Sequence, residues 1–214
     1  MLLRFTKMHG LGNDFMMVDL ISQPVTLNPK LIKELSDRRF GIGFDQLLTV
    51  RPPARPDSDF RYTIYNADGS EAEQCGNGAR CFLGFVRDEG LTTKSTIRLE
   101  TSNGNITCKL GKDGNVTVDM GKPALQPGKV PFVADSPQIN YQLSLGPEYP
   151  NTFSISALNV GNPHAVITVP AVDSAPVLEA GPLVERHPRF PEGVNVGFME
   201  VVSRKKIRLR VFER

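Results

Sequence analysis

The chain has 214 residues with 25 Lys or Arg against 23 Asp or Glu, so it can bury a substantial core and carries little net charge. Without a basic block or an aromatic–basic stripe, nucleic acid and anionic membranes are not expected as partners, and no apolar run is long enough to span a bilayer. Three cysteines without a CxxC pair argue against a disulfide framework and a structural zinc site, so we expect a soluble protein of a reducing cytoplasm.

The first half of the chain is predicted to contain strands and two helices. Apolar and β-branched runs predict three strands, at residues 2–5, 15–20 and 60–66, and residues 47–50 form a further apolar run. Asn28 followed by Pro29 predicts the start of a helix, because asparagine caps helix N-termini and proline suits the first turn. Asn66 falls on the apolar side of the last strand, so its amide needs a partner in the protein or in a ligand.

The strongest signal for chemistry lies in residues 66–86. A turn at 66–69 is followed by Cys75 and then by apolar residues at helical spacing: Ala79, Phe82, Leu83 and Val86. The predicted helix ends near Gly90 and is apolar almost all round, which indicates that other elements enclose it. Cys75 is therefore expected at the N-terminus of a buried helix.

A thiol at a helix N-terminus has a chemical use. The helix dipole and the N–H groups of Gly76, Asn77 and Gly78, expected to be unpaired, favour negative charge, so the thiol should ionise readily. The same amides can hold a ligand carboxylate beside the sulfur. The alternative interpretation is that residues 76–78 are only a turn and that Cys75 is a small buried hydrophobic residue. Cys81 and Cys108 are interpreted as structural.

Residues 96–120 are predicted to form a three-stranded meander with a hairpin turn at Asp113-Gly114. The segment 121–131, rich in glycine and proline, is the predicted boundary between two domains, 1–120 and 121–214. Beyond it we predict the following elements: strands at 139–145, 153–158, 165–169, 199–203 and 206–212, and a short helix at 182–187 ended by Pro188.

The second half of the chain repeats the first at offsets of 147 to 152 residues. Three pairs of segments match: 12–15 with 161–164, 41–46 with 193–198, and the strand ending in Asn66 with the strand ending in Glu213. If the halves are equivalent, a second Cys–Gly helix is expected shortly beyond Arg214. Two thiols facing one carbon from opposite sides would invert its configuration, since one removes a proton and the other returns one.

With these motifs the chain resembles the diaminopimelate epimerases, enzymes that convert LL- to meso-diaminopimelate in lysine biosynthesis without pyridoxal phosphate. The motifs that carry the resemblance are HGLGNDF (9–15), GIGFDQ (41–46), YNADGSEAEQCGNGARC (65–81), VGNPH (160–164), GVNVGF (193–198) and FER (212–214). The resemblance implies an α/β (α+β) fold of two pseudo-symmetric domains, each a barrel-like sheet wrapped around a central helix, with the active site between them. It also implies a homodimer that uses no cofactor or metal.

The resemblance further implies roles for individual residues. Cys75 matches the first catalytic cysteine, His164 and Glu213 match polar groups beside the two thiols, and the amides of Gly76 and Asn77 match those that hold the reacting carboxylate. Substrate-contacting positions are matched by Asn13, Gln46, Asn66, Asn162, Asn195, Glu213 and Arg214. Glu213 shares a strand face with apolar residues, so we expect it to be sheltered.

For three of these residues a simpler interpretation stays open. Asn13 can be a turn asparagine, His164 a turn histidine with its hydrogen bonds satisfied, and Glu213 an exposed charge at a strand end.

The resemblance also shows a difference. The second catalytic cysteine of the family does not occur in residues 1–214, so ordinary epimerisation by these residues alone is expected to fail and the second domain is expected to lack its central helix. Two alternatives remain: an inactive relative that binds diaminopimelate, and an isomerase of the same fold with another substrate, such as a proline-type racemase or the phenazine-pathway isomerase. The CGNG setting of Cys75 argues against the phenazine enzyme, which does not use the cysteine pair.

Overall fold

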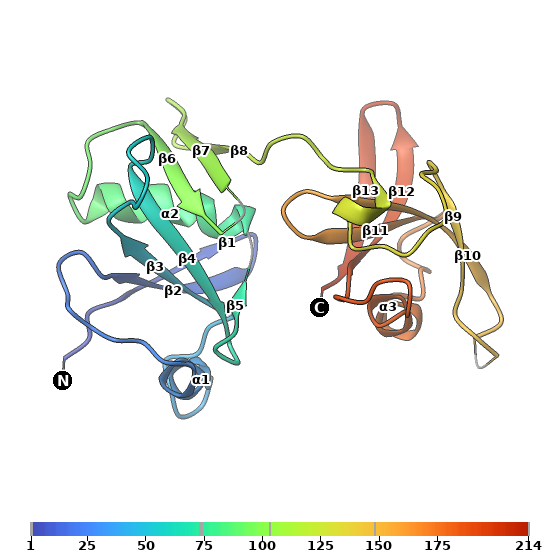
Figure 1. The fold of residues 1–214 in the computed structure, drawn as a ribbon, viewed down its shortest axis with the longest axis horizontal. Helices are drawn as coiled ribbons and strands as arrows, with labels where there is room; N and C mark the ends of the chain where they lie inside the picture. Colours follow the sequence, from blue (N-terminus) through green and yellow to red (C-terminus); the bar gives the residue numbers. More distant parts are fainter. Residues whose placement is uncertain (1, 73–74, 103, 148, 214) are drawn as a thin grey trace. The chain divides into compact units, whose positions relative to one another are not determined.

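The computed structural model describes residues 2–72, 75–102, 104–147 and 149–213. The chain divides into two compact units, Met1–Gly121 (unit 1) and Lys122–Arg214 (unit 2), each with its own curled sheet (Figure 1). None of the helices in these ranges has the length and apolar character that crossing a membrane requires.

Unit 1 is an eight-stranded sheet that curls around one helix. Its elements are β1 (Thr6–Gly10), β2 (Asn13–Asp19), α1 (Pro29–Ser36), β3 (Gln46–Arg51), β4 (Phe60–Asn66), β5 (Glu71–Ala72), α2 (Gly76–Asp88), β6 (Thr96–Thr101), β7 (Gly104–Leu110) and β8 (Val116–Asp119). The strand order is β1-β2-β3-β4-β6-β7-β8, with β5 paired to β4. Helix α2 contacts both the first and the last strand of this order, so the sheet wraps around it (Figure 1).

The predicted helix after Cys75 is confirmed as α2, and its apolar residues fill the main core of unit 1. Phe82, Leu83 and Val86 are fully buried. The Phe82 ring meets the rings of Phe60 and Tyr62 edge-on, at centroid distances of 5.9 and 5.2 Å. Each large apolar side chain buried in this way contributes about 1.5–3 kcal/mol to folding. This packing fixes the position of α2, and with it the N-terminus of the helix, against the sheet.

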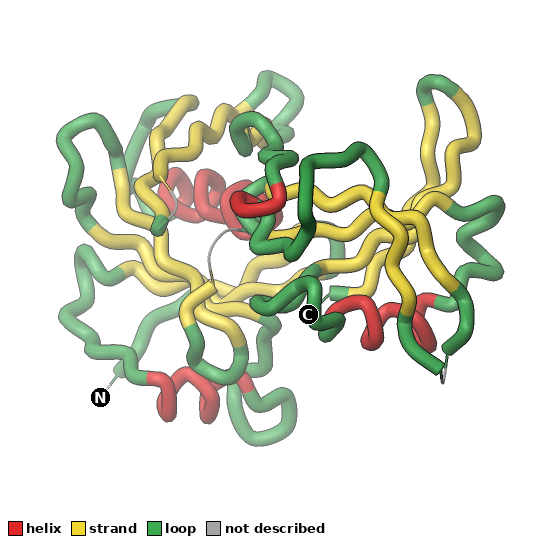
Figure 2. The backbone as a smooth tube through the Cα atoms, turned by 45° about the vertical axis from the view of Figure 1, so that its right-hand side comes forward, coloured by secondary structure: helices red, strands yellow, loops and turns green. Residues whose placement is uncertain are grey.

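Helix α1 covers the other face of the same sheet, as Figure 2 shows. Its predicted cap is confirmed, because the Asn28 side chain accepts a hydrogen bond of 2.9 Å from the Leu31 N–H group. Ile32 is buried against Met16 and Leu47. The sheet thus carries α2 on one face and α1 on the other.

Unit 2 is a five-stranded sheet of order β13-β12-β11-β10-β9. Its elements are the 3-10 turn η1 (Pro127–Lys129), β9 (Tyr141–Ser144), β10 (Thr152–Asn159), β11 (Pro163–Thr168), α3 (Val177–Glu185), β12 (Asn195–Ser203) and β13 (Lys206–Phe212). Helix α3 packs on β12 and β13, and Phe212 lies against Gly181 so closely that a Cβ there would meet the ring at 2.7 Å.

The internal duplication is visible in the strand connections. In the order β1-β2-α1-β3-β4 the successive pairs are antiparallel, parallel and antiparallel, and β10-β11-α3-β12-β13 repeats this pattern. Each parallel pair needs a crossover, which α1 and α3 provide. The register pairs Phe15 with Gln46 and, at the same offset, His164 with Asn195. Gln46 thus corresponds to Asn195. The sequence match of 41–46 with 193–198 had aligned Gln46 with Phe198, three residues further on, because it followed the glycines and not the hydrogen-bond register.

Three predicted elements were wrong in their bounds, and one of them is the strand predicted at 199–203, which begins at Asn195 as β12. The first strand is β1, at Thr6–Gly10 and not at 2–5, and a tight turn through Leu11 and Gly12, both at positive φ, puts Asn13 inside β2. Helix α3 begins at Val177 and contains Pro182, the residue predicted to start the helix. Val177, Ala180, Gly181 and Val184 form its buried face, and this packing outweighs the lost hydrogen bond of the proline.

The two sheets also differ in how one of their faces is covered. In β4, Phe60, Tyr62 and Ile64 point toward α2 and are buried. The corresponding residues of β13 are about half exposed: Ile207 at 54%, Leu209 at 52% and Val211 at 51%. Helix α3 lies on the opposite face, where Phe212 points. The face of unit 2 that corresponds to the α2-binding face of unit 1 is therefore apolar and open to solvent in the described residues.

Candidate active site

Cys75 is the N-cap of α2 and is half-buried. Its Sγ atom accepts a hydrogen bond of 3.3 Å from the Gly78 N–H group, so the expectation that this amide is unpaired is wrong. Among the described residues no acceptor takes the N–H groups of Gly76 and Asn77. The sulfur thus caps its own helix, and two donors remain beside it.

The Cys75 carbonyl oxygen accepts two hydrogen bonds from unit 1. It accepts hydrogen bonds from the Ala79 N–H group at 2.9 Å and from the Tyr62 hydroxyl at 3.2 Å. Burial raises the pKa of Tyr62 well above its usual value, so the phenol stays protonated and can donate. Sequence reasoning missed this contact, whose one signal is that Tyr62 lies on the apolar face of its strand.

Three predicted side-chain amides of unit 1 lie at one edge of the sheet, where β2 and β3 begin and the antiparallel β4 ends. The Asn13 Nδ2 atom is 4.0 Å from the Cys75 Sγ atom. Gln46 and Asn66 are paired across β3 and β4, and Gln46 Nε2 donates to Asn66 Oδ1 at 3.1 Å. Asn66 Nδ2 donates in turn to Ser70 Oγ at 3.1 Å. The structure therefore brings Asn13 to the thiol and links Gln46 to Asn66.

Two oxygen atoms of this group have no partner in the described part of the chain. Asn13 Oδ1 and Gln46 Oε1 are buried and accept no hydrogen bond from the described residues. A buried acceptor without a donor costs about 1–3 kcal/mol, and such groups are rare in folded proteins. The pair is therefore suited to a ligand that brings N–H donors close to Cys75.

The predicted residues of unit 2 form a second group. His164 Nε2 lies 2.8 Å from Asn162 Oδ1, and burial lowers the pKa of His164 below its usual value of about 6.5. The ring is therefore neutral at pH 7, with Nε2–H donating to Asn162. Asn195 pairs with His164 across β11 and β12. Because Val196 pairs with Phe212 in the antiparallel pair β12 and β13, Glu213 lies opposite Asn195. This row corresponds to the row Phe15, Gln46 and Asn66 of unit 1.

Two predictions for the end of β13 had different outcomes. Glu213 is exposed, so the expectation of a sheltered carboxylate is wrong. The reason is that its apolar strand neighbours on that face, Leu209 and Val211, are half exposed themselves. Arg214, predicted to contact the substrate, lies outside the described residues.

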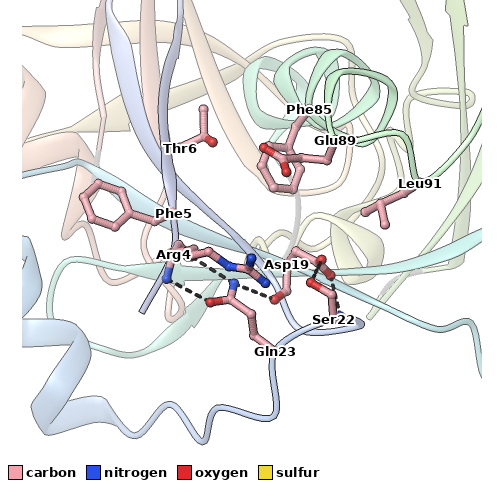
Figure 3. Close-up of a pocket in the computed structure, with 9 residues that line it drawn as sticks. All are labelled: Arg4, Phe5, Thr6, Asp19, Ser22, Gln23, Phe85, Glu89 and Leu91. Atoms are coloured by element: carbon pink, nitrogen blue, oxygen red, sulfur yellow. Dashed lines mark hydrogen bonds between the residues drawn. The ribbon is translucent and has the colours of Figure 1, made fainter. Parts of the chain in front are cut away.

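A cavity of about 290 Å³ lies at the other end of α2, as Figure 3 shows. It is lined by Arg4, Phe5, Thr6, Asp19, Ser22, Gln23, Phe85, Glu89 and Leu91. Gln23 bridges the Arg4 backbone, and the Asp19 carboxylate accepts hydrogen bonds from the loop that follows it. Neither Cys75 nor any predicted site residue lines it, so this cavity is separate from the candidate site.

The three thiols should differ sharply in reactivity. Burial raises the pKa of Cys108 to about 12 and raises the pKa of Cys81 as well, whereas Cys75 sits at a helix N-terminus. With iodoacetamide at pH 8 we expect carboxamidomethylation of Cys75 at least about 100-fold faster than of the other two, measured by peptide mass spectrometry. Equal labelling of all three in the folded protein would contradict the proposed environment, and labelling in denaturant controls for peptide detection.

Comparison with known proteins identifies relatives along the whole chain. The sequence profile of the diaminopimelate epimerase family matches residues 5–126 and 156–214. The chain is 59% identical to the diaminopimelate epimerase of Aromatoleum aromaticum and 58% identical to that of Ectopseudomonas mendocina, over 214 residues each. Both alignments cover 100% of this chain and 76% of the relative.

Solved structures show the same fold at low sequence identity. A hydroxyproline epimerase from Agrobacterium vitis, with bound trans-4-hydroxy-L-proline, matches with a TM-score of 0.66 and 15% identity, over 97% of this chain and 69% of that chain. A probable proline racemase from Agrobacterium radiobacter, with bound carbonate, matches with a TM-score of 0.67 and 16% identity, over 98% and 70%. These two structures show the fold, and the family profile and the sequence relatives show that the chain belongs to the diaminopimelate epimerase family of isomerases.

Proposed function

We propose that this protein interconverts LL- and meso-diaminopimelate in lysine biosynthesis, using the Cys75 thiolate and no pyridoxal phosphate. The observation that carries the proposal is the position of Cys75 Sγ, which caps a buried helix beside the N–H groups of Gly76 and Asn77. A helix N-terminus favours the thiolate, and the same dipole favours a bound carboxylate. The choice of diaminopimelate as the substrate rests on the sequence identity to named diaminopimelate epimerases.

The proposed chemistry is removal of the proton on the α-carbon. The substrate carboxylate accepts hydrogen bonds from the Gly76 and Asn77 amides, which brings the α-carbon to Cys75. The C–H bond breaks, the proton moves to sulfur, and the electron pair spreads into the carboxylate. Preorganised amides and the helix dipole stabilise this developing charge, and in many enzymes such electrostatic stabilisation lowers the barrier more than any other effect.

The side-chain amides can bind the amino groups of the substrate. Asn13 Oδ1 and Gln46 Oε1 accept no hydrogen bond within the described part of the chain, and an ammonium group supplies three donors. Diaminopimelate has two amino-acid ends, so a second set of polar groups is needed for the remote end. We assign this set to Asn66 of unit 1 and to the unit 2 residues Asn162, Asn195, Glu213 and Arg214, and we assign His164 a supporting role as a neutral donor to Asn162.

Inversion needs a second acid on the opposite face of the carbon. All three cysteines of the chain lie in residues 1–121, and the named relatives are longer than the part that aligns here. For the 214 residues we therefore expect the Cys75 half of the reaction: the proton of one stereoisomer is removed and returned on the same face. We further propose a homodimer in the cytoplasm that acts on this small molecule without a cofactor.

The test is solvent exchange in D₂O with purified LL- and meso-diaminopimelate. We expect deuterium at one α-carbon by NMR, with inversion absent or much slower than exchange. Absence of exchange, together with binding of diaminopimelate by calorimetry, would contradict the catalytic proposal and favour a binding protein. The lack of a second cysteine in residues 122–214 is the observation that makes this second candidate worth testing. Exchange of proline but not of diaminopimelate would instead identify another substrate.

A further inference from the structure

Four charged side chains gather at the ends of β2 and β3 that carry Asn13 and Gln46. The Arg38 guanidinium group forks onto Asp14, with Nη1–Oδ2 at 3.2 Å and Nη2–Oδ1 at 2.7 Å, and Nη2 also bonds Asp45 Oδ1 at 2.7 Å. Lys7 Nζ is 2.7 Å from Asp14 Oδ2. We call Lys7, Asp14, Arg38 and Asp45 the β2–β3 clamp.

The two aspartates also tie the backbones together. The Asp14 N–H group donates to Asp45 Oδ2 at 3.0 Å, and the Asp45 N–H group donates to Asp14 Oδ1 at 3.0 Å. Asp14 directly follows Asn13, and Asp45 directly precedes Gln46. Each carboxylate therefore holds the other strand one residue away from an amide of the candidate site. The Asp45 N–H group also donates to the Asp14 backbone carbonyl oxygen at 3.0 Å, and the reciprocal side-chain bonds add to this backbone contact between the two strand ends.

The loop that carries Arg38 is itself closely packed. Lys7 Nζ donates to the Gly43 carbonyl oxygen. Gly43 has a φ of +72°, and a Cβ there would lie 3.0 Å from the Arg38 Cα atom. Only glycine fits this position without strain. The close packing of Gly43 on Arg38 therefore holds the backbone from which the Arg38 side chain extends.

The charges of the clamp balance, which limits its role. Two cations face two carboxylates, so the clamp adds no net charge, and Arg38 is already committed to acids of the protein. The Arg38 hydrogen bond is the largest cause that holds the pKa of Asp14 well below its usual range, while Asp14 raises the pKa of Arg38, so both stay charged. The Arg38 side chain is 58% exposed, and exposed ion pairs add little stability. Bidentate arginine–carboxylate pairs do add geometric precision.

We propose that Arg38 is a positioning residue: by bridging Asp14 and Asp45 it sets the separation of the Asn13 and Gln46 amides that receive the substrate. The inference rests on the proposed function, because those amides matter only if they bind a ligand. It differs from a stabilising role, since the loss of Arg38 should change substrate turnover more than it changes folding. A misplacement of about 1 Å in such a group can lower a rate about 100-fold.

The test compares Arg38→Met with Arg98→Met. Arg98 makes one ion pair of 3.0 Å with Asp57 in the same unit, at similar exposure and away from the site. For Arg38→Met we expect kcat/KM for deuterium exchange into diaminopimelate to fall about 10- to 100-fold. Arg98→Met should keep wild-type kcat/KM, and the two variants should melt within a few degrees of each other. Arg38→Lys keeps the charge but cannot fork onto both aspartates, so we expect it to recover little.

A substrate-free measurement separates this inference from the proposed function. In ¹H–¹⁵N spectra the backbone amides of Asp14 and Asp45 and the side-chain amides of Asn13 and Gln46 should shift and lose exchange protection in Arg38→Met but not in Arg98→Met. If the wild-type chain exchanges no deuterium, the proposed function fails while these spectra still decide on the clamp. Unchanged spectra, kcat/KM within threefold of wild type, or full activity in Arg38→Lys would each overturn the clamp.

Discussion

Replacement of Cys75 by serine is expected to lower the rate of α-deuterium exchange by about 10²- to 10⁴-fold, the range that a general base contributes. The hydroxyl group can still accept the hydrogen bond that Sγ takes from the Gly78 N–H group, and serine is a favourable N-cap. It does not ionise near neutral pH, however, and so cannot act as a base. We therefore expect a folded protein, with an unchanged or higher melting temperature, that has lost exchange.

Two further variants make this result specific. Cys75→Ala removes the base and also the cap, so it should lose exchange and some stability, less than the about 0.5–2 kcal/mol that the loss of an oxygen cap costs, because sulfur is a weaker acceptor. Cys108→Ala alters a fully buried cysteine elsewhere in the same core, and it should keep the wild-type exchange rate while losing some stability. Exchange within threefold of wild type in Cys75→Ser would remove Cys75 from the proposed mechanism.

Replacement of Gly78 by alanine is expected to destabilise unit 1 by about 1–3 kcal/mol, the usual cost of overpacking. A Cβ at this position would lie 2.3 Å from the Tyr62 hydroxyl oxygen and 2.8 Å from Leu48 Cδ2. Both neighbours are buried, so the first turn of α2 must move away from the sheet. That movement would also shift Cys75 and the Gly76 and Asn77 amides. We expect a lower urea midpoint and, in the same variant, a loss of exchange.

Gly84 offers the matched control within the same helix. Its Cβ would find Met8 Cε at 3.5 Å, which is ordinary contact, and alanine inside a helix is better than glycine by about 0.5–1 kcal/mol. Gly84→Ala should therefore raise the urea midpoint while Gly78→Ala lowers it. Adding Tyr62→Phe to Gly78→Ala removes the closer of the two clashes and should restore part of the stability. A Gly78→Ala protein as stable as wild type would show that the helix start is not packed as closely as described.

The sequence by itself determined the elements that make the site in unit 1. Helix starts and ends are local, so Asn28 with Pro29, and Cys75 with Gly90, were enough to predict α1 and α2. The strand Phe60–Asn66 was predicted with the observed bounds, because alternation of apolar residues is also local. The repeat of short motifs likewise predicted a duplicated arrangement, which the strand pairing confirms.

Tertiary structure alone decided how these elements meet. The correspondence of Gln46 with Asn195 follows from strand register, which a glycine pattern does not encode. The Arg38 bridge joins residues 7 and 24 positions apart, and such long-range bonds leave no periodic trace in a sequence. Glu213 shows the same limit, since alternation defines one face of a strand without saying whether anything packs on it. Local sequence patterns determine where helices and strands form. The hydrogen-bond partners of a side chain, the register of its strand and its burial depend on the whole fold.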